Sequence, residues 1–480
     1  MLQLIHALNS NERRYFKLYT GLQSGGKKYA ALFDVLAEMQ QYDAPAVCTK
    51  LNVSRKQLGD DKAYLEVILL KALQAYHAND NYRAQILNGL LEADIIAAKG
   101  LFTYALSHLQ KLKRIFPEHG KDDLVYVMLL LKESNFKRRS IPGFFKGDAE
   151  GKADEISERL ENVLVNTKLT ILGIEMADLA DDNTYIADKD VLRKAAGIIG
   201  KYHALEKERK FSVGAQITGC ILLCNYYLHL GVDSKLALQH AQKGLHLFSA
   251  ESKKFNELNS YNHYLLIMAM LQSYFALNNV KGCVESINRL KTFAAGKIPV
   301  ALAKRASFSA IKFEILTATA AGNYTAALNV IRQTGEQAMQ LTPFAEDAAV
   351  FTLFEAINLF HLQRYDEALQ QLMILLASDA PDQRPETRLG ARVLNLILQH
   401  ELGNSISMPN YIRADARFFK TNKWVSEETE LFMELIRYLT RSNNRSKLAE
   451  FKRKFEAIYD NRRLELIGHF VILPWLDRLY

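Results

Sequence analysis

Apolar residues in this chain recur at helical spacing in long segments that end in short turns, and one form of this pattern repeats. After each turn, a second segment begins with an aromatic or apolar residue and carries a small residue three positions further on. The copies span residues 100–106, 231–237, 278–284, 322–328 and 363–369, of which the second contains one inserted residue. We expect a pair of helices joined by a tight turn at each copy.

The residue types in each copy predict how its two helices meet. Glycine or asparagine at the turn suits the left-handed conformation that ends a helix, and the aromatic residue is expected to pack back on the first helix. The small residue stands where the helices approach most closely, and an apolar residue follows four positions later on the same face. The small residues are Ala105, Ala237, Cys283, Ala327 and Ala368. Each hairpin buries only one side, so the copies are expected to stack.

These copies resemble the tetratricopeptide repeat. Tyr365-Asp366-Glu367-Ala368-Leu369 closely matches the start of that family's second helix, and Gly100, Ala105 and Pro117 stand at the spacing of its turn glycine, small residue and closing proline. Two features depart from the family. The tryptophan and glycine of its first helix are missing, and the small residues are 46, 44 and 41 apart (237 to 283 to 327 to 368), against about 34 in the family. The resemblance implies an all-α fold, an α-α superhelix of the TPR-like right-handed solenoid type.

The two ends of the chain lack this pattern and are predicted to be non-repeat helical caps. We assign 1–79 to an N-terminal helical cap, 80–408 to the TPR-like helical repeat region and 409–480 to a C-terminal helical cap. In the first cap, Asn9 and Glu12 have the spacing of a capping box, and further helices are expected over about 28–40 and 62–76. Three segments of the caps look like a group of uncharacterised bacterial helical-repeat proteins: Arg13-Arg14-Tyr15-Phe16-Lys17-Leu18-Tyr19, Tyr64-Leu65-Glu66-Val67-Ile68-Leu69-Leu70-Lys71 and Pro474-Trp475-Leu476. This resemblance implies no function.

Composition places the chain among ordinary globular proteins. Proline is rare, at 9 of 480 residues, as expected where helices dominate. The net charge of +8 is small for this length, and four cysteines are too few for a disulfide framework. The first residues do not resemble a signal peptide, and the uncharged run over 258–280 holds too many polar residues for a membrane span. We therefore expect a cytoplasmic protein without a membrane span.

Motifs for catalysis or for cofactor binding are weak. Gly21-Leu22-Gln23-Ser24-Gly25-Gly26-Lys27-Lys28 has the frame of a phosphate-binding loop, but Lys28 replaces its Ser/Thr and a helical segment precedes it. Cys220 and Cys224 lie one helical turn apart and could ligate zinc, although their apolar surroundings favour small buried side chains. No zinc-hydrolase, nucleophile-elbow or dinucleotide motif is present. We expect no enzyme activity, cofactor or metal site.

Three segments bear on nucleic acid. Residues 47–58 faintly resemble a helix-turn-helix with Val53-Ser54 at the turn, but Gly59-Asp60-Asp61 is expected to interrupt the second helix after one turn. Residues 136–146 carry four cations beside Phe144-Phe145, and 441–463 carry eight cations, most simply explained as a solvated helix face.

Aligned on the small residues, the first helices lack the Lys and Asn pair with which tetratricopeptide proteins hold an acidic peptide terminus. Only Lys312 fits. The inner face instead looks apolar. Either its residues pack internally in a closed superhelix, or they line an apolar groove for a partner helix. The candidate partner-binding residues are Met268, Phe275, Lys312, Leu353, Ile357 and Phe360.

The function expected from these features is that of a non-catalytic protein-protein interaction scaffold, which presents a concave helical-repeat surface to a protein or peptide partner. The alternative is a nucleic-acid-linked regulator that uses the N-terminal helices and the basic clusters.

Overall fold

Every regular element in the described part of the chain is a helix. The computed structural model describes residues 1–22, 26–79, 82–116, 120–140, 149–182, 189–230, 233–341, 345–377, 385–422, 426–441, 447–460 and 468–479. The chain is therefore all-α, as its hydrophobic pattern predicts. None of the helices in these ranges combines the length and the apolar character needed to cross a bilayer.

The chain divides into two compact units, Met1–Leu160 and Glu161–Tyr480. The helices of the first unit are α1 (Leu2–Ala7), α2 (Ser10–Gly21), α3 (Gly26–Glu38), α4 (Ala44–Leu51), α5 (Arg55–Tyr76), α6 (Tyr82–Ala98), α7 (Phe102–Lys113) and α8 (Leu124–Ser140). Helix α9 (Ala149–Asp182) crosses the division. This division does not test the boundaries that the sequence suggests at residues 79 and 408, which stay predictions.

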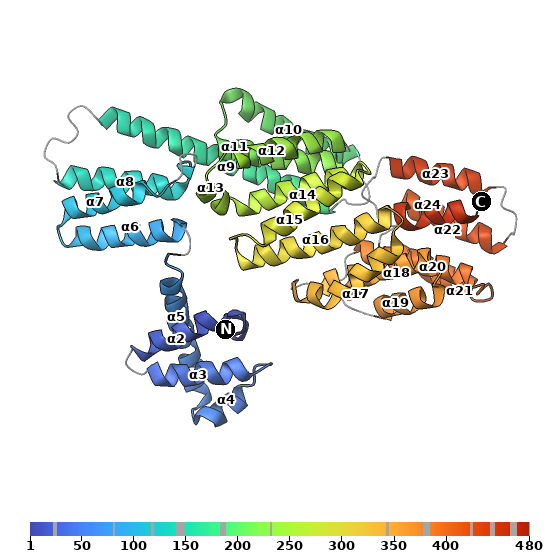
Figure 1. Ribbon diagram of the computed structural model, residues 1–480, viewed down its shortest axis with the longest axis horizontal. Helices are drawn as coiled ribbons and strands as arrows, with labels where there is room; N and C mark the ends of the chain where they lie inside the picture. Colours follow the sequence, from blue (N-terminus) through green and yellow to red (C-terminus); the bar gives the residue numbers. More distant parts are fainter. Residues whose placement is uncertain are drawn as a thin grey trace. The chain divides into compact units, whose positions relative to one another are not determined.

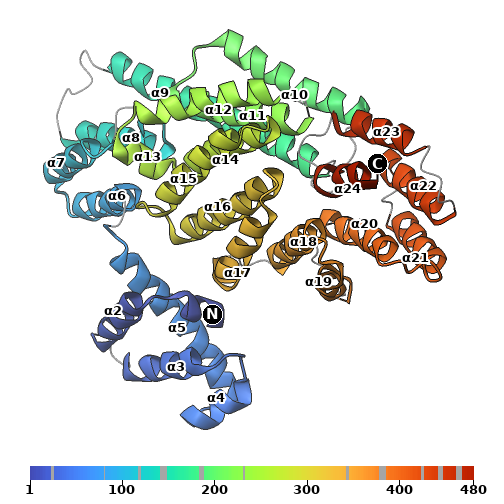
Figure 2. The ribbon, with the colours of Figure 1, turned by 45° about the vertical axis from the view of Figure 1, so that its right-hand side comes forward.

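Helices α1 to α5 share a hydrophobic core, in which the rings of Phe16 and Phe33 lie 4.6 Å apart. Figure 2 shows α5 beside α2, α3 and α4, the helices that it contacts. The predicted capping box opens α2. The Asn9 side chain accepts hydrogen bonds from the amides of Asn11 and Glu12, and the Asn9 amide donates to the Glu12 carboxylate at 2.8 Å.

The expectation that Gly59-Asp60-Asp61 would interrupt the second helix is wrong. Helix α5 runs unbroken through these residues for 22 residues. A glycine inside a helix costs only about 1 kcal/mol, and burial of Leu58 and Leu65 on the same face outweighs that cost. The buried Asp61 is compensated by Lys28, whose ammonium lies 2.6 Å from its carboxylate.

Helices α6, α7 and α8 lie side by side as consecutive neighbours in the first unit (Figure 1). Helix α6 contacts α7, α7 contacts α8, and α6 also contacts α8. The two outer helices therefore run in the same direction, with α7 antiparallel to both.

The second unit also consists of helices that pack as consecutive neighbours. Its elements after α9 are α10 (Lys189–Glu208), α11 (Val213–Asn225), η2 (Tyr226–Leu230), α12 (Ser234–Ser249), α13 (Lys253–Leu258), α14 (Ser260–Ala276), α15 (Val280–Ala294), α16 (Val300–Ala320), α17 (Tyr324–Leu341), α18 (Ala345–His361), α19 (Tyr365–Ala377), α20 (Pro385–Glu401), α21 (Met408–Thr421), α22 (Glu427–Arg441), α23 (Leu448–Asp460), η3 (Gly468–Ile472) and α24 (Leu473–Leu479). Successive helices from α14 to α24 pack on one another, η3 lying between α23 and α24. Alternate helices α11, α14, α16, α18, α20 and α22 also contact one another in a row.

The predicted helix-ending turns are confirmed at four of the five copies. Gly100, Asn278, Gly322 and Gln363 all have positive φ, between 54° and 78°. At each turn, the residue after the left-handed one donates its amide hydrogen to a carbonyl five residues earlier in the chain. This bond satisfies a carbonyl at the end of the helix. These bonds join Leu101 to Ile96, Asn279 to Tyr274, Asn323 to Ala318 and Arg364 to Leu359. The turn glycine of the remaining copy, Gly231, lies outside the described residues.

The small residues of all five copies are buried at helix contacts, as predicted. The apolar residues four positions later are buried as well: Leu109, Ile287, Ile331 and Leu372. The aromatic residues behave less uniformly. The Tyr365 ring lies 6.0 Å from Phe360 on the preceding helix, whereas Tyr324 stacks at 4.3 Å on His361 of the next pair.

Replacing Ala327 by leucine is expected to destabilise the protein by about 1–3 kcal/mol. Ala327 is fully buried, so the added carbons would force its neighbours apart. The matched control is Ala326→Leu, because Ala326 is exposed one position earlier on the same helix. Urea unfolding should separate the two variants, and equal midpoints would show that the close helix contact is misplaced.

Candidate functional site

The six candidate residues of the predicted inner face fall into two groups. Leu353, Ile357 and Phe360 are fully buried in the core of the second unit. Met268, Phe275 and Lys312 are half-buried, and the first two pack against that core. Their role in partner binding stays a prediction, but the three buried side chains offer no surface to a partner in this arrangement.

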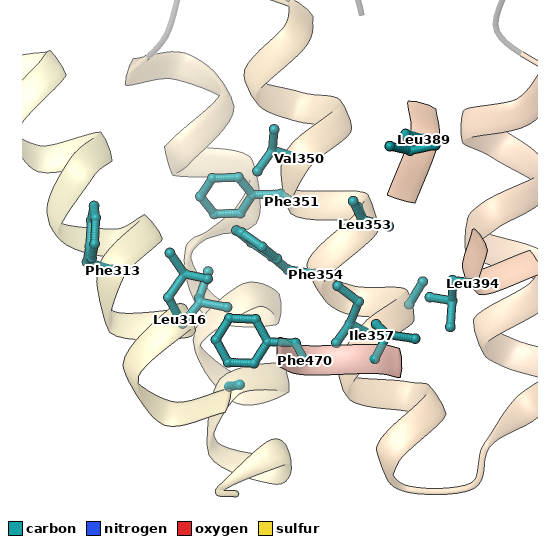
Figure 3. Close-up of a cluster of buried hydrophobic side chains, with 14 of the residues drawn as sticks. Phe313, Leu316, Val350, Phe351, Leu353, Phe354, Ile357, Leu389, Leu394 and Phe470 are labelled. Carbon is teal, nitrogen blue, oxygen red and sulfur yellow. The ribbon is translucent and has the colours of Figure 1, made fainter. Parts of the chain in front are cut away.

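A C-terminal segment of the chain packs against Phe275, Ile357 and Phe360 of this set. Phe470, in η3, places its ring 6.1 Å from Phe275, and its carbonyl accepts a hydrogen bond from His361 Nε2 at 2.5 Å. Figure 3 shows the Phe470 ring among Leu316, Phe354 and Ile357. Since η3 comes from the far end of the chain, the apolar inner side of α16 and α18 is closed by the protein itself.

Helix α24 continues this cover. The guanidinium of Arg478 lies 4.2 Å from the ring centre of Phe360. The indole Nε1 of the buried Trp475 donates to Glu401 at 2.8 Å, and the same carboxylate accepts from the Tyr365 hydroxyl at 3.2 Å. The C-terminal segment is therefore joined by polar contacts to α18, α19 and α20.

Burial lowers the pKa of His361 to about 4, against its ordinary 6.5, and Arg478 lowers it further while the Phe470 carbonyl opposes the shift. As pH falls, the unfolded chain binds this proton first, so stability should fall between about pH 6.5 and 4. His361→Gln keeps a donor but cannot titrate. We expect the stability of the His361→Gln variant to depend less on pH over this range than the stability of the wild type. The control variant His203→Gln, which alters an exposed histidine, should behave like the wild type. Equal pH profiles would contradict this role.

An exposed apolar surface lies instead in the first unit. We call it the α6/α8 face, and it consists of Leu87, Leu91 and Ile95 of α6 with Leu124, Met128 and Leu131 of α8. Each of these side chains is between 42% and 60% exposed. Spacings of three and four residues put each set of three on one side of its helix.

The opposite sides of both helices hold this face outward. Ile86, Leu90 and Ala93 of α6 are buried, as are Val125 and Leu129 of α8. These residues pack inward against the α7 side of the hairpin, so the exposed residues cannot turn in without breaking that core. The α6/α8 face is therefore fixed by the packing of the helices behind it.

Two ion pairs join the helices along the α6/α8 face. Arg83 of α6 lies 3.7 Å from Asp123, and Asp94 lies 2.5 Å from Lys132 of α8. Residue numbers rise together in the two pairs, so α6 and α8 are parallel and in register. The two apolar rows therefore run alongside each other, with the first ion pair before them and the second at their far end.

Sequence reasoning missed this face because it compared other positions. Leu91 stands 14 residues before the small residue Ala105, just as Phe354 stands 14 before Ala368. Phe354 is 2% exposed under the C-terminal segment, whereas Leu91 is 56% exposed. The predicted inner positions, 15 and 11 before the small residue, pick out Leu90 and Asp94 in α6. The sequence does contain a signal for this face, because α6 is apolar on nearly every side. A helix that packs only one side against a core does not need a second apolar row, so the outward row indicates an exposed apolar surface.

The described residues bear on two of the weaker sequence motifs. The loop resembling a phosphate-binding motif follows α2, a helix, and Lys28 is engaged by Asp61. Burial raises the pKa of the Cys220 thiol to about 11, which opposes the thiolate that zinc requires. Across the described ranges, no group of three or more His, Cys, Asp or Glu side chains is placed to hold a metal ion.

The two basic clusters are partly neutralised. In the first, Lys137 pairs with Glu133 at 2.8 Å and Arg139 lies over the Phe102 ring, while Phe144 and Phe145 lie outside the described residues. In the second, Lys452 pairs with Asp477 at 2.6 Å and Lys454 with Glu450 at 2.8 Å. These pairs engage two of the eight cations, and Arg445, Arg462 and Arg463 lie outside the described residues.

Comparison with protein-family models finds no matching family, and a search of curated proteins finds no match either. The resemblance to the tetratricopeptide repeat accordingly rests on the residues of the chain and on the helix pairs that they form.

Proposed function

We propose that this protein is a non-catalytic scaffold of TPR-like repeats, forming a right-handed α-α superhelix, and that its α6/α8 face binds a protein partner. The geometry that carries the proposal is the exposure of six large apolar side chains on two adjacent, parallel helices. Water contact with apolar surface costs about 25 cal/mol per Å², so a face held outward by its own core gains most from a partner that covers it.

Other exposed apolar residues support binding less well. Helix α9 exposes Leu160, Leu164, Ile171 and Ile174, but these form a single row on one helix. The α6/α8 face presents two rows, which can contact both sides of an inserted side chain. Binding energy concentrates where apolar anchors are surrounded on several sides, so the two-helix surface is the stronger candidate.

Co-purification tests this proposal. The full-length chain, isolated from cells of its source with and without nuclease treatment, should retain the same protein partner in both samples. The partner is expected to stay bound because an apolar interface does not depend on nucleic acid. Loss of every associated protein after nuclease treatment would reject the scaffold and favour the alternative below.

One observation supports the alternative of a nucleic-acid-linked regulator. Helices α4 and α5 are joined by a three-residue turn in which Asn52 is left-handed, and α5 continues without the expected break. Its first turn exposes Arg55, Lys56 and Gln57, side chains that contact phosphates and base edges in helix-turn-helix proteins. The exposed Asp60 on the next turn opposes such binding.

Fluorescence anisotropy with a labelled DNA duplex tests this alternative. If α5 enters the major groove, Arg55→Glu with Lys56→Glu should weaken binding by at least about tenfold and reduce its dependence on salt. Arg14→Glu with Lys71→Glu is the matched control, because it changes the charge equally at exposed cations of α2 and α5, outside the first turn of α5. Equal loss in the control would mean that attraction to the duplex is only general.

A further inference from the structure

The charge around the α6/α8 face is uneven along its length. At the end where the two helices begin, Arg83 and Asp123 pair with each other. Beside the last residues of the two apolar rows, Asp94 and Lys132 do the same. Those charges compensate each other and give a partner no electrostatic preference.

Beyond the second ion pair, where the two helices end, stand cations without such compensation. Lys99 follows the last residue of α6 and Arg138 stands in the last turn of α8, and both are exposed. Neither forms an ion pair with any residue that the structure describes. The ion pairs Arg83–Asp123 and Asp94–Lys132 set the register of the two helices. In this register Lys99 lies level with residues 137–139, so the two cations lie at the same end of the face.

The shape of the apolar part fits a helix. The rows of α6 and α8 repeat every three or four residues over about two turns, and an amphipathic helix packs its own apolar row alongside such rows. We propose that the α6/α8 face binds an amphipathic α-helix of a protein partner, with acidic residues at the end that lies by Lys99 and Arg138. This rests on the proposed scaffold function and adds the chemistry and orientation of the partner.

Synthetic amphipathic peptides of about 18 residues, or five helical turns, test the proposal on the full-length chain. All peptides share one row of leucines, and each carries a pair of acidic, neutral or lysine residues at one end or at the other. The anisotropy of a fluorescent label on the peptide reports Kd. One acidic peptide should bind about three- to tenfold more tightly than its neutral version, since each exposed ion pair contributes little. The advantage should vanish in about 1 M salt, where the screening length is about 3 Å.

The variant Lys99→Glu with Arg138→Glu should reverse the preference in favour of the lysine-ended peptide. Such a reversal separates recognition from any effect of the two cations on the stability of their helices. If acidic and neutral peptides bind equally, the proposed partner chemistry is wrong while the scaffold function stands. If no peptide binds, the helical occupant itself is wrong, and co-purification decides the scaffold function separately.

Discussion

Trp475→Ala is expected to destabilise the protein by about 3–5 kcal/mol, the largest effect of any single substitution that we predict. The indole is buried where α24 covers the second unit, and its removal leaves a cavity that the surrounding helices cannot fill. It also removes the donor to Glu401 Oε1. Urea unfolding followed by circular dichroism should show a much lower midpoint than that of the wild type.

Trp475→Phe is the matched control. Phenylalanine keeps most of the apolar volume and loses only the hydrogen bond to Glu401, so about 1–2 kcal/mol should be lost. If alanine and phenylalanine cost the same, the hydrogen bond rather than the packing holds α24. If neither changes the midpoint, the C-terminal segment does not close the inner side of α16 and α18.

The second large effect concerns binding. Leu91→Ser combined with Met128→Ser should weaken binding of the co-purified partner by at least about tenfold. The reason is that two apolar anchors are lost from the centre of the α6/α8 face. Serine adds no charge, so the result reports apolar contact and leaves the ion pairs unchanged. Titration of the purified partner measures the change in Kd.

Tyr104→Ser supplies the control for this pair. Tyr104 is 65% exposed on α7, in the same helical hairpin but outside the α6/α8 face. The Tyr104→Ser variant should bind the partner as tightly as the wild type does. All the altered residues are exposed, so the thermal midpoints should stay close together, and equal weakening by Tyr104→Ser would place the interface elsewhere.

Local features of the fold are readable from the sequence where a few neighbouring residues determine them. The left-handed turns at Gly100, Asn278 and Gly322 follow from residue types that tolerate positive φ. The burial of Ala327 and Ala368 follows from their size and their spacing from the turn. Gln363 is also left-handed although its side chain gives little sign of it, and there the repeat pattern rather than the residue type identifies the turn.

Long-range packing is what the sequence does not reveal. That Phe470 covers the inner side of α18 depends on contacts across more than 100 residues, such as that between His361 and Phe470. The continuity of α5 through Gly59 depends on core packing that outweighs a local helix breaker. The same limit hid the α6/α8 face, because Leu91 and Phe354 occupy matching repeat positions and differ only in what covers them.

Site-specific photocrosslinking tests the central claim most directly. A photoreactive phenylalanine analogue placed at Leu91 of the full-length chain, in cells of the source, is predicted to crosslink to the co-purifying partner. The same analogue at Tyr104 should give no such product, because Tyr104 is exposed on α7, outside the α6/α8 face. A partner that crosslinks from position 104 and not from position 91 would contradict the claim that the α6/α8 face is the binding surface.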